Sequence, residues 1–232
     1  MNVFLRLATD LLKLLFPRLC NACSGYLVRG ERNICTTCLR DLPYTDYHLH
    51  ADNRAAKQFW GRIPCKAVSA MLYFRKGSRV QRMLHRLKYN GQMDLGLELG
   101  QLLGNRLKAG GSYADIDLVL AVPLHPKRER LRGYNQSQCI ANGVAQCLNV
   151  PVLEGVLCKH RSTSSQTRKG RFSRYENLKD VFEIRDAERI CGKQILLIDD
   201  VITTGATIEA CGQVLYDAGV ESLSIAAIAF TE

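Results

Sequence analysis

Two adjacent carboxylates, Asp199 and Asp200, end the apolar run ILLIDD. A loop of small residues follows them, and a helical pattern begins at Ile208. The loop consists of Thr203, Thr204, Gly205, Ala206 and Thr207. A buried strand that leads through such a loop into a helix presents backbone N–H groups and a helix N-terminus to an anion. We therefore expect a phosphate in the loop and the hydroxyls of an attached sugar on the two carboxylates, a combination that a ribose 5-phosphate supplies.

Other sites that use a strand, a loop and a helix fit this segment less well. A P-loop needs the pattern GxxxxGK[ST], and a dinucleotide site needs GxGxxG after a strand; neither pattern occurs in the chain. A receiver domain opens with a similar strand and paired acids, but it needs a later Asp and Lys, and only 32 residues follow Asp200. The remaining alternative, that the acids only cap a loop at a sheet edge, does not account for carboxylates, loop and helix occurring as one unit.

The formal net charge of +10 indicates anionic partners. Eleven of the 32 lysines and arginines lie in two clusters. The first contains Lys127, Arg128, Arg130 and Arg132, and the second contains Lys159, Arg161, Arg168, Lys169, Arg171, Arg174 and Lys179. Either cluster could hold a pyrophosphate or follow a nucleic-acid backbone, and the charge alone does not choose between them.

Four of the ten cysteines form two CxxC pairs, Cys20 with Cys23 and Cys35 with Cys38. Thiolates at this spacing can close a tetrahedral site around zinc, and four cysteine ligands leave no open position, so the predicted site is structural. Disulfides or unrelated buried cysteines are the alternatives. No secretory leader is recognisable, which favours a reducing, cytoplasmic location and therefore a metal. The predicted zinc ribbon, residues 19–43, is too small to fold without its metal.

Hydrophobic periodicity predicts an α/β domain over residues 65–232. Strands are expected at 65–74, 117–122, 180–184 and 222–230 in addition to the run that ends at Asp200, and helices at 77–88, 93–107, 136–148 and 208–218. Residues 1–18 predict an amphipathic helix, whose apolar run is too short and too interrupted to span a membrane. The polar stretch 44–64 is interpreted as a linker. The polar segment 159–179 predicts a lid or a disordered loop.

The segment 195–207 resembles the phosphoribosyl-pyrophosphate (PRPP) motif of type I phosphoribosyltransferases, and the likeness extends over residues 117–232. The whole chain is more closely similar to the ComF family, the competence-associated, GntX-like predicted phosphoribosyltransferases. That likeness rests on the four-cysteine ribbon and on the PRPP motif, together with LKY at 87–89, VPLHPKRERLRGYNQ at 122–136 and SSQTRKGRFSRYEN at 164–177. The family is associated with DNA uptake in transformable bacteria.

The resemblance implies a type I phosphoribosyltransferase-like parallel sheet flanked by helices, with the small four-cysteine zinc ribbon at its N-terminal side. It implies that Asp199 and Asp200 are catalytic, that residues 203–207 hold the 5-phosphate of PRPP, and that Mg²⁺ accompanies PRPP. It assigns a pyrophosphate loop to Pro123, Leu124, His125, Lys127 and Arg128, followed by Arg132, Gly133, Asn135 and Gln136. It assigns a flexible loop to Gln166, Thr167, Arg171 and Asn177.

Two functions of different classes remain compatible with these residues. The first is an Mg-dependent phosphoribosyltransferase, a pentosyl glycosyltransferase, with an acceptor and an oligomeric state that the sequence does not name. The second is a module without turnover that senses PRPP or a nucleotide, or binds single-stranded DNA or a partner such as a helicase. Aromatic residues are only 7% of the chain, which weakens the DNA-binding reading. Glutamine hydrolysis, known from amidophosphoribosyltransferases, is not expected, because the chain begins Met1-Asn2 rather than with a nucleophilic cysteine.

Overall fold

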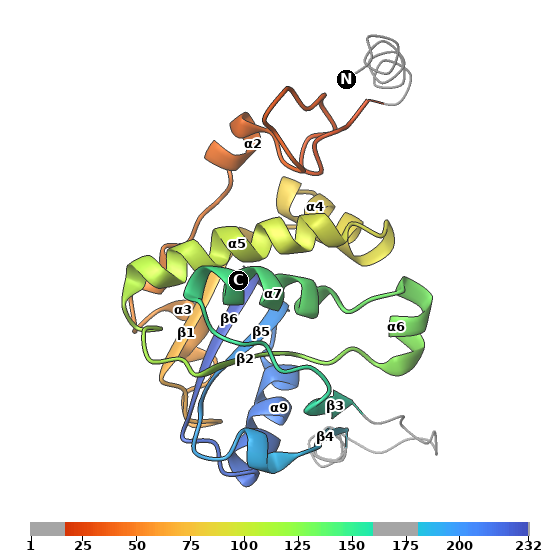
Figure 1. The fold of residues 1–232 in the computed structure, drawn as a ribbon. Helices are drawn as coiled ribbons and strands as arrows, with labels where there is room; N and C mark the ends of the chain where they lie inside the picture. Colours follow the sequence, from red (N-terminus) through yellow and green to blue (C-terminus); the bar gives the residue numbers. More distant parts are fainter. Residues whose placement is uncertain (1–16, 160–180, 232) are drawn as a thin grey trace, which may run out of the picture.

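The computed structural model describes residues 17–159 and 181–231 (Figure 1). Its main sheet has four parallel strands in the order β1–β6–β5–β2. The strands are β1 (Ala67–Phe74), β2 (Leu118–Ala121), β5 (Gln194–Ile202) and β6 (Ser222–Thr231). This confirms the predicted parallel sheet. The predicted N-terminal helix, up to residue 16, and the predicted flexible-loop residues Gln166, Thr167, Arg171 and Asn177 lie outside the described residues.

Helices cover both faces of the sheet (Figure 1). On one face lie α4 (Arg79–Tyr89), α5 (Met93–Gly110) and α7 (Gln136–Leu148), and on the other lie α3 (Arg54–Lys57) and α9 (Ala206–Asp217). The smaller elements are α2 (Thr36–Arg40), η1 (Tyr47–Leu49), α6 (Pro126–Arg132), η2 (Ala187–Arg189) and an antiparallel hairpin of β3 (Leu157–Lys159) and β4 (Phe182–Ile184). Within the described ranges, no helix is long and apolar enough to cross a membrane.

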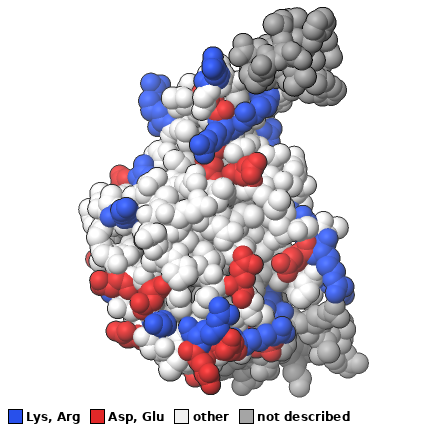
Figure 2. All heavy atoms as spheres, in the orientation of Figure 1, with Lys and Arg blue, Asp and Glu red and all other residues white. Residues whose placement is uncertain are grey.

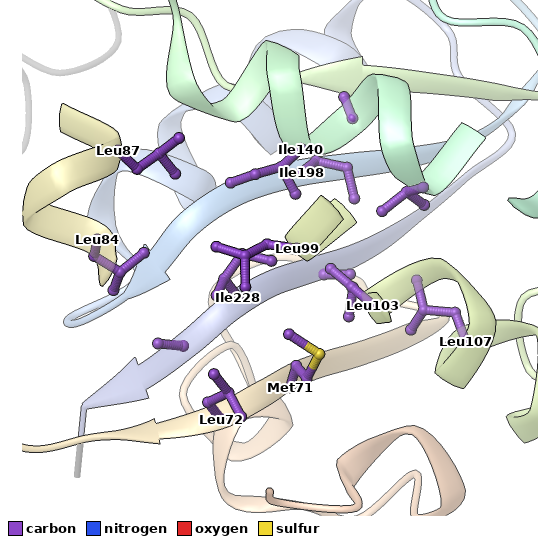
Figure 3. Packing of buried hydrophobic residues seen from close by; sticks show 14 of the residues in the cluster. Met71, Leu72, Leu84, Leu87, Leu99, Leu103, Leu107, Ile140, Ile198 and Ile228 are labelled. Atoms are coloured by element: carbon purple, nitrogen blue, oxygen red, sulfur yellow. The ribbon is translucent and has the colours of Figure 1, made fainter. Parts of the chain in front are cut away.

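The strands are mostly apolar because both faces of the sheet are buried. In β5, Ile198 points to the α5 and α7 face and its neighbour Leu197 to the α9 face. Figure 3 shows the first of these two cores, where Leu99 and Leu103 of α5 lie over Ile228 of the sheet. Alternate residues of each strand therefore supply two separate cores, which hold the carboxyl ends of β2 and β5 in fixed positions.

The four-cysteine ribbon packs onto the main domain through this same core. Ile34 and Leu42 of the ribbon are buried together with Leu84 and Leu87 of α4. The carboxylate of Glu98 on α5 accepts hydrogen bonds from the backbone N–H and from the side-chain amide of Asn33, at 3.1 and 2.8 Å. The ribbon is thus joined to α4 and α5 by apolar and polar contacts.

The linker predicted for residues 44–64 is wrong, because this stretch is part of the core. It forms η1 and α3, and its apolar residues Tyr47, Ala55, Ala56, Phe59 and Ile63 are buried. Asn53 caps α3 by accepting a hydrogen bond from the Ala56 N–H, and its amide donates to the Val68 carbonyl. The polar residues that suggested a linker lie between these few buried positions. The average composition of the stretch therefore does not reveal that its apolar residues are buried.

Glycines allow α5 and α7 to approach each other closely. A Cβ on Gly100 would meet the backbone carbonyl of Ile140, and a Cβ on Gly104 would lie 2.8 Å from the Cβ of Cys147. We expect Gly100→Ala to destabilise the protein by about 1–3 kcal/mol, because the helices must separate. Urea unfolding measures this loss. Asn105→Ala, at an exposed position of α5, is the control and should be neutral or slightly stabilising; equal stability of the two variants would contradict the prediction.

Candidate functional site

The acid pair lies in the second half of β5, with β2 on one side and β6 on the other. One oxygen of Asp199, Oδ1, accepts hydrogen bonds from the Ser137 hydroxyl at 3.1 Å and from the Asp200 backbone N–H at 2.8 Å. Lys88 of α4 places its Nζ 2.7 Å from Oδ2 of Asp200. Burial, with the neighbouring charge of Asp200, raises the pKa of Asp199 to about 7, against the opposing effect of these hydrogen bonds and of Lys88.

The small-residue loop connects β5 to α9. Thr203, Thr204 and Gly205 form the connection, while Ala206 and Thr207 are the first residues of the helix. Gly205 has a φ of +73°, a left-handed conformation that glycine adopts without strain, and it offers no side-chain cap to α9. The first N–H groups of this twelve-residue helix therefore have no side-chain acceptor from the N-cap, as an anion-binding helix N-terminus requires.

Arg62, from the stretch that polarity alone marks as a linker, supports this loop from outside. Its Nη1 donates to the Thr204 carbonyl at 2.8 Å and to the Gln58 carbonyl at 2.9 Å, and its Nε donates to Glu209 of α9 at 2.9 Å. Phe59 lies so close to Gly205 that a Cβ there would come within 2.8 Å of its ring. The conformation of the loop is thus fixed by residues more than a hundred positions earlier in the chain.

Replacing Arg62 with methionine is expected to destabilise the protein by about 2–4 kcal/mol, because the mostly buried Glu209 carboxylate loses an ion pair. Chemical denaturation gives the value. The double variant Arg62→Met/Glu209→Leu is the control and should recover much of the loss, since no charge is then left buried. Additive effects of the two changes would show that the ion pair does not stabilise the loop.

The predicted pyrophosphate loop is partly helical. Pro123 and Leu124 follow β2 as a loop, but Lys127 and Arg128 belong to α6. The helix begins there because Pro126 occupies its first turn and because Nδ1 of His125 accepts a hydrogen bond from the Lys127 N–H. Gly133, with a φ of +80°, ends it. The basic cluster at 127–132 is therefore held on one short helix after β2.

These elements surround a cleft of about 350 Å³. Of the residues singled out by sequence, the cleft lining includes Asp199, Asp200, Thr203, Thr207, Pro123, Leu124 and Arg128. Thr204, Gly205, Ala206, His125 and Lys127 are not part of that lining. The cleft thus brings together the acid pair, the start of α9 and three of the five residues of the predicted pyrophosphate loop.

Four cations share the cleft with the two carboxylates. Lys88 comes from α4, Arg128 and Arg132 from α6, and Lys159 from β3. Burial lowers the pKa of Lys159, and nearby Arg128 lowers it further. On the face seen in Figure 2, basic side chains gather at the ribbon and around the rim of the domain, with a largely uncharged belt between them. The cleft therefore combines a place for hydroxyls with a strongly cationic wall suited to phosphates.

A second, larger cavity of about 510 Å³ adjoins the cleft. The two share Pro123, Leu124, Asn135 and Lys159. Its own lining is mostly uncharged, with the amides of Gln138 and Asn142 on α7 and the apolar side chains of β2 and β3. There is consequently room for a second, less charged group beside the anion-binding cleft.

The four predicted metal ligands come together in the ribbon. The Sγ atoms of Cys20, Cys23, Cys35 and Cys38 all lie within 4.8 Å of one another, and those of Cys23 and Cys35 are 3.9 Å apart. A tetrahedral zinc–thiolate site with bonds of about 2.3 Å separates its sulfurs by about 3.8 Å. The Cys20 sulfur accepts N–H groups from Ala22 and Cys35. Although burial opposes it, such donors lower the pKa of Cys20 to about 7, which favours the thiolate. The arrangement fits a structural metal centre.

Sequence patterns did not reveal the roles of Lys88 and Arg62. LKY at 87–89 carries part of the family likeness, but nothing in its spacing relates Lys88 to an acid pair more than a hundred residues later. Arg62 stands among polar residues with no pattern. Only the helical spacing of the apolar residues Ala55, Ala56, Phe59 and Ile63 could have indicated that its segment is buried.

Comparisons with known proteins agree with this geometry. A model of the phosphoribosyl transferase domain matches residues 136–231, which include β5, the acid pair, α9 and β6. Competence protein F of Haemophilus influenzae is 24% identical over 89% of this chain and 94% of its own length. DNA utilization protein YhgH of Escherichia coli K12 is 25% identical over 90% and 95%, and competence protein ComFC of Streptococcus pneumoniae is 29% identical over 88% and 84%. The chain is therefore similar over most of its length to these competence and DNA utilization proteins, and its C-terminal part matches the phosphoribosyl transferase domain.

Proposed function

We propose that this protein binds PRPP with Mg²⁺ in the cleft and transfers its phosphoribosyl group to an acceptor. The observation that carries the proposal is that β5 leads through the acid pair to the start of α9, where the N-cap is a glycine, and that cationic side chains line the same cleft. A sugar that bears a phosphate at one end and a diphosphate at the other matches this order of groups. The matched phosphoribosyl transferase domain supports the same assignment.

Each part of the cleft has a role in that reaction. The N–H groups at the start of α9 hold the 5-phosphate. Asp199 and Asp200 accept hydrogen bonds from the ribose hydroxyls and stabilise the positive charge that develops on the sugar as the diphosphate leaves. Arg128, Arg132 and Lys159 balance the negative charge of the departing diphosphate. The larger, mostly uncharged cavity beside the cleft is the place for the acceptor.

Mg²⁺, when bound with PRPP, supplies charge neutralisation and orients the diphosphate against the ribose hydroxyls. Oxygen-rich groups are its preferred ligands, and the cleft offers the carboxylates of Asp199 and Asp200 near the place of those hydroxyls. The ion of the ribbon is a different one. Four thiolates favour zinc, which we infer to be the structural metal of the Cys20, Cys23, Cys35 and Cys38 cluster.

Calorimetric titration with PRPP, with and without Mg²⁺, tests the binding step. We expect Mg-dependent binding by the wild type and none by the double variant Asp199→Asn/Asp200→Asn. Asp217→Asn, an exposed acid on α9, is the matched control and should bind as the wild type does. An absence of binding by folded, zinc-loaded wild-type protein would overturn the proposal. Incubation with PRPP and candidate acceptors, with release of pyrophosphate as the readout, then separates a transferase from a PRPP sensor.

A second candidate function is a nucleic-acid or partner-binding module, related to the DNA uptake and DNA utilization for which the relatives are named. One observation favours it. Tyr89 is 59% exposed, and the Arg132 guanidinium lies 5.1 Å from its ring centre, an arrangement on which a base can stack. Tyr89→Ala tests this: a fall in affinity for single-stranded DNA, with unchanged PRPP binding, would show that the protein uses this side chain for DNA.

A further inference from the structure

Lys88 stands out among the cations of the cleft, because it alone of them is paired with a member of the acid pair in the described structure. Its Nζ lies 2.7 Å from Oδ2 of Asp200, and the two side chains are only 28% and 14% exposed. A lysine side chain is long and flexible, so a fixed position for its ammonium needs a fixed backbone behind it. The position of the Lys88 ammonium therefore depends on how firmly the helix that carries Lys88 is held.

Three contacts fix this helix, α4. On its inner side Leu84 and Leu87 are buried in the core with α5 (Figure 3). At its carboxyl end the hydroxyl of Tyr134 donates to the Leu87 carbonyl, which ties α4 to the segment that joins α6 and α7. On the ribbon side Arg86 donates to the Cys20 carbonyl and to the Ser24 hydroxyl, both at 2.9 Å.

The ribbon contact is next to a metal ligand. Arg86 grips the backbone of Cys20, whose sulfur belongs to the four-cysteine cluster, and Lys88 follows Arg86 by two residues. Helix α4 therefore contacts the four-cysteine cluster through Arg86 and the acid pair through Lys88. Within the described ranges, no other element forms hydrogen bonds or ion pairs with both sites.

We propose that Lys88 is a positioning residue for Asp200, and that the four-cysteine ribbon holds it in place through Arg86. The inference rests on the proposed function, because Asp200 is there to receive a ribose hydroxyl. A carboxylate that must accept hydrogen bonds has to be turned toward the ligand. The ammonium of Lys88 engages Oδ2 of Asp200, which leaves the other oxygen of Asp200 for the sugar. It also counters the repulsion between two adjacent acids.

PRPP affinity, measured by calorimetry in the presence of Mg²⁺, tests this role in zinc-loaded protein. We expect Lys88→Met to weaken binding by about thirtyfold or more, and Lys88→Arg to restore most of the affinity because the positive charge returns. Arg82→Met is the matched control, since it removes the same charge from an exposed position of the same helix; its affinity should equal that of the wild type. Zinc content and near-ultraviolet circular dichroism confirm that each variant is folded.

Two further combinations separate positioning from a general loss of charge. If Lys88 acts through Asp200, Lys88→Met should cause little further loss in an Asp200→Asn background. If the ribbon acts through Lys88, Arg86→Met should weaken binding while the zinc content stays unchanged, and it should have no effect once Lys88 is methionine. Binding by Lys88→Met equal to the wild type would overturn the inference and leave the proposed function intact. No binding by the wild type would overturn both.

Discussion

Replacing Cys35 with serine is expected to release the metal from the ribbon and to unfold residues 19–43. The reason is that the four sulfurs within 4.8 Å of one another form the centre of a segment that is too small to build a core of its own. Zinc binding to such small four-ligand sites is worth about 10–16 kcal/mol, and that free energy is also the folding free energy of the segment. Zinc content by atomic spectroscopy and protease resistance of the ribbon measure the two effects.

The effect should extend beyond the ribbon. Ile34, Cys38 and Leu42 are buried against α4 and α5, so their release exposes Leu84 and its neighbours to water. We expect a lower melting temperature for the whole protein as well as rapid proteolysis of the ribbon. Cys191→Ser, at an exposed cysteine outside the cluster, is the control and should keep both zinc and stability. One zinc per chain and an unchanged melting temperature in Cys35→Ser would contradict the prediction.

The parts of this structure that the sequence predicts well are those with a local pattern. The spacing of the cysteines predicts their cluster, and the run ILLIDD followed by small residues predicts a strand, a turn and a helix. Helix α7 begins and ends at the predicted residues because Asn135 caps its start and a left-handed Asn149 follows its end. Each of these signals involves neighbours within one or two turns of chain.

The parts that the sequence does not predict depend on contacts between distant segments. The ion pair of Lys88 with Asp200 and the bonds of Arg62 to the loop of Thr204 join residues more than a hundred positions apart. Their local patterns are those of ordinary surface cations. Residues 44–64 were similarly obscured, because a short buried helix needs only a few apolar positions. The ion pair of Lys88, the contacts of Arg62 and the burial of residues 44–64 all depend on packing between distant segments, which a local sequence pattern does not indicate.

The second large effect concerns Asp199, whose substitution should have opposite consequences for stability and for binding. Asp199→Asn keeps an oxygen to accept the hydrogen bonds of Ser137 and of the Asp200 N–H, but it removes a charge from a buried site. We expect the variant to be more stable than the wild type at pH 8 by a few kcal/mol at most, and to have lost affinity for PRPP. A residue kept at a cost in stability is typical of a functional site.

The dependence on pH gives the prediction its sign. Folding raises the pKa of Asp199 from 3.8 to about 7, mainly through burial and then through Asp200, so the folded protein binds this proton more tightly than the unfolded chain. The contribution of Asp199 to the stability of the wild type should therefore fall as pH rises from about 4 to about 7 and change little above that range. The asparagine variant has no such group. The difference in unfolding free energy between the two proteins should be near zero at pH 4 and largest above pH 7.

Urea unfolding between pH 4 and pH 8 measures this difference, with Asp217→Asn as a surface control. A difference that stays constant with pH, or a variant less stable than the wild type at pH 8, would mean that Asp199 is already ionised at low pH in the folded protein.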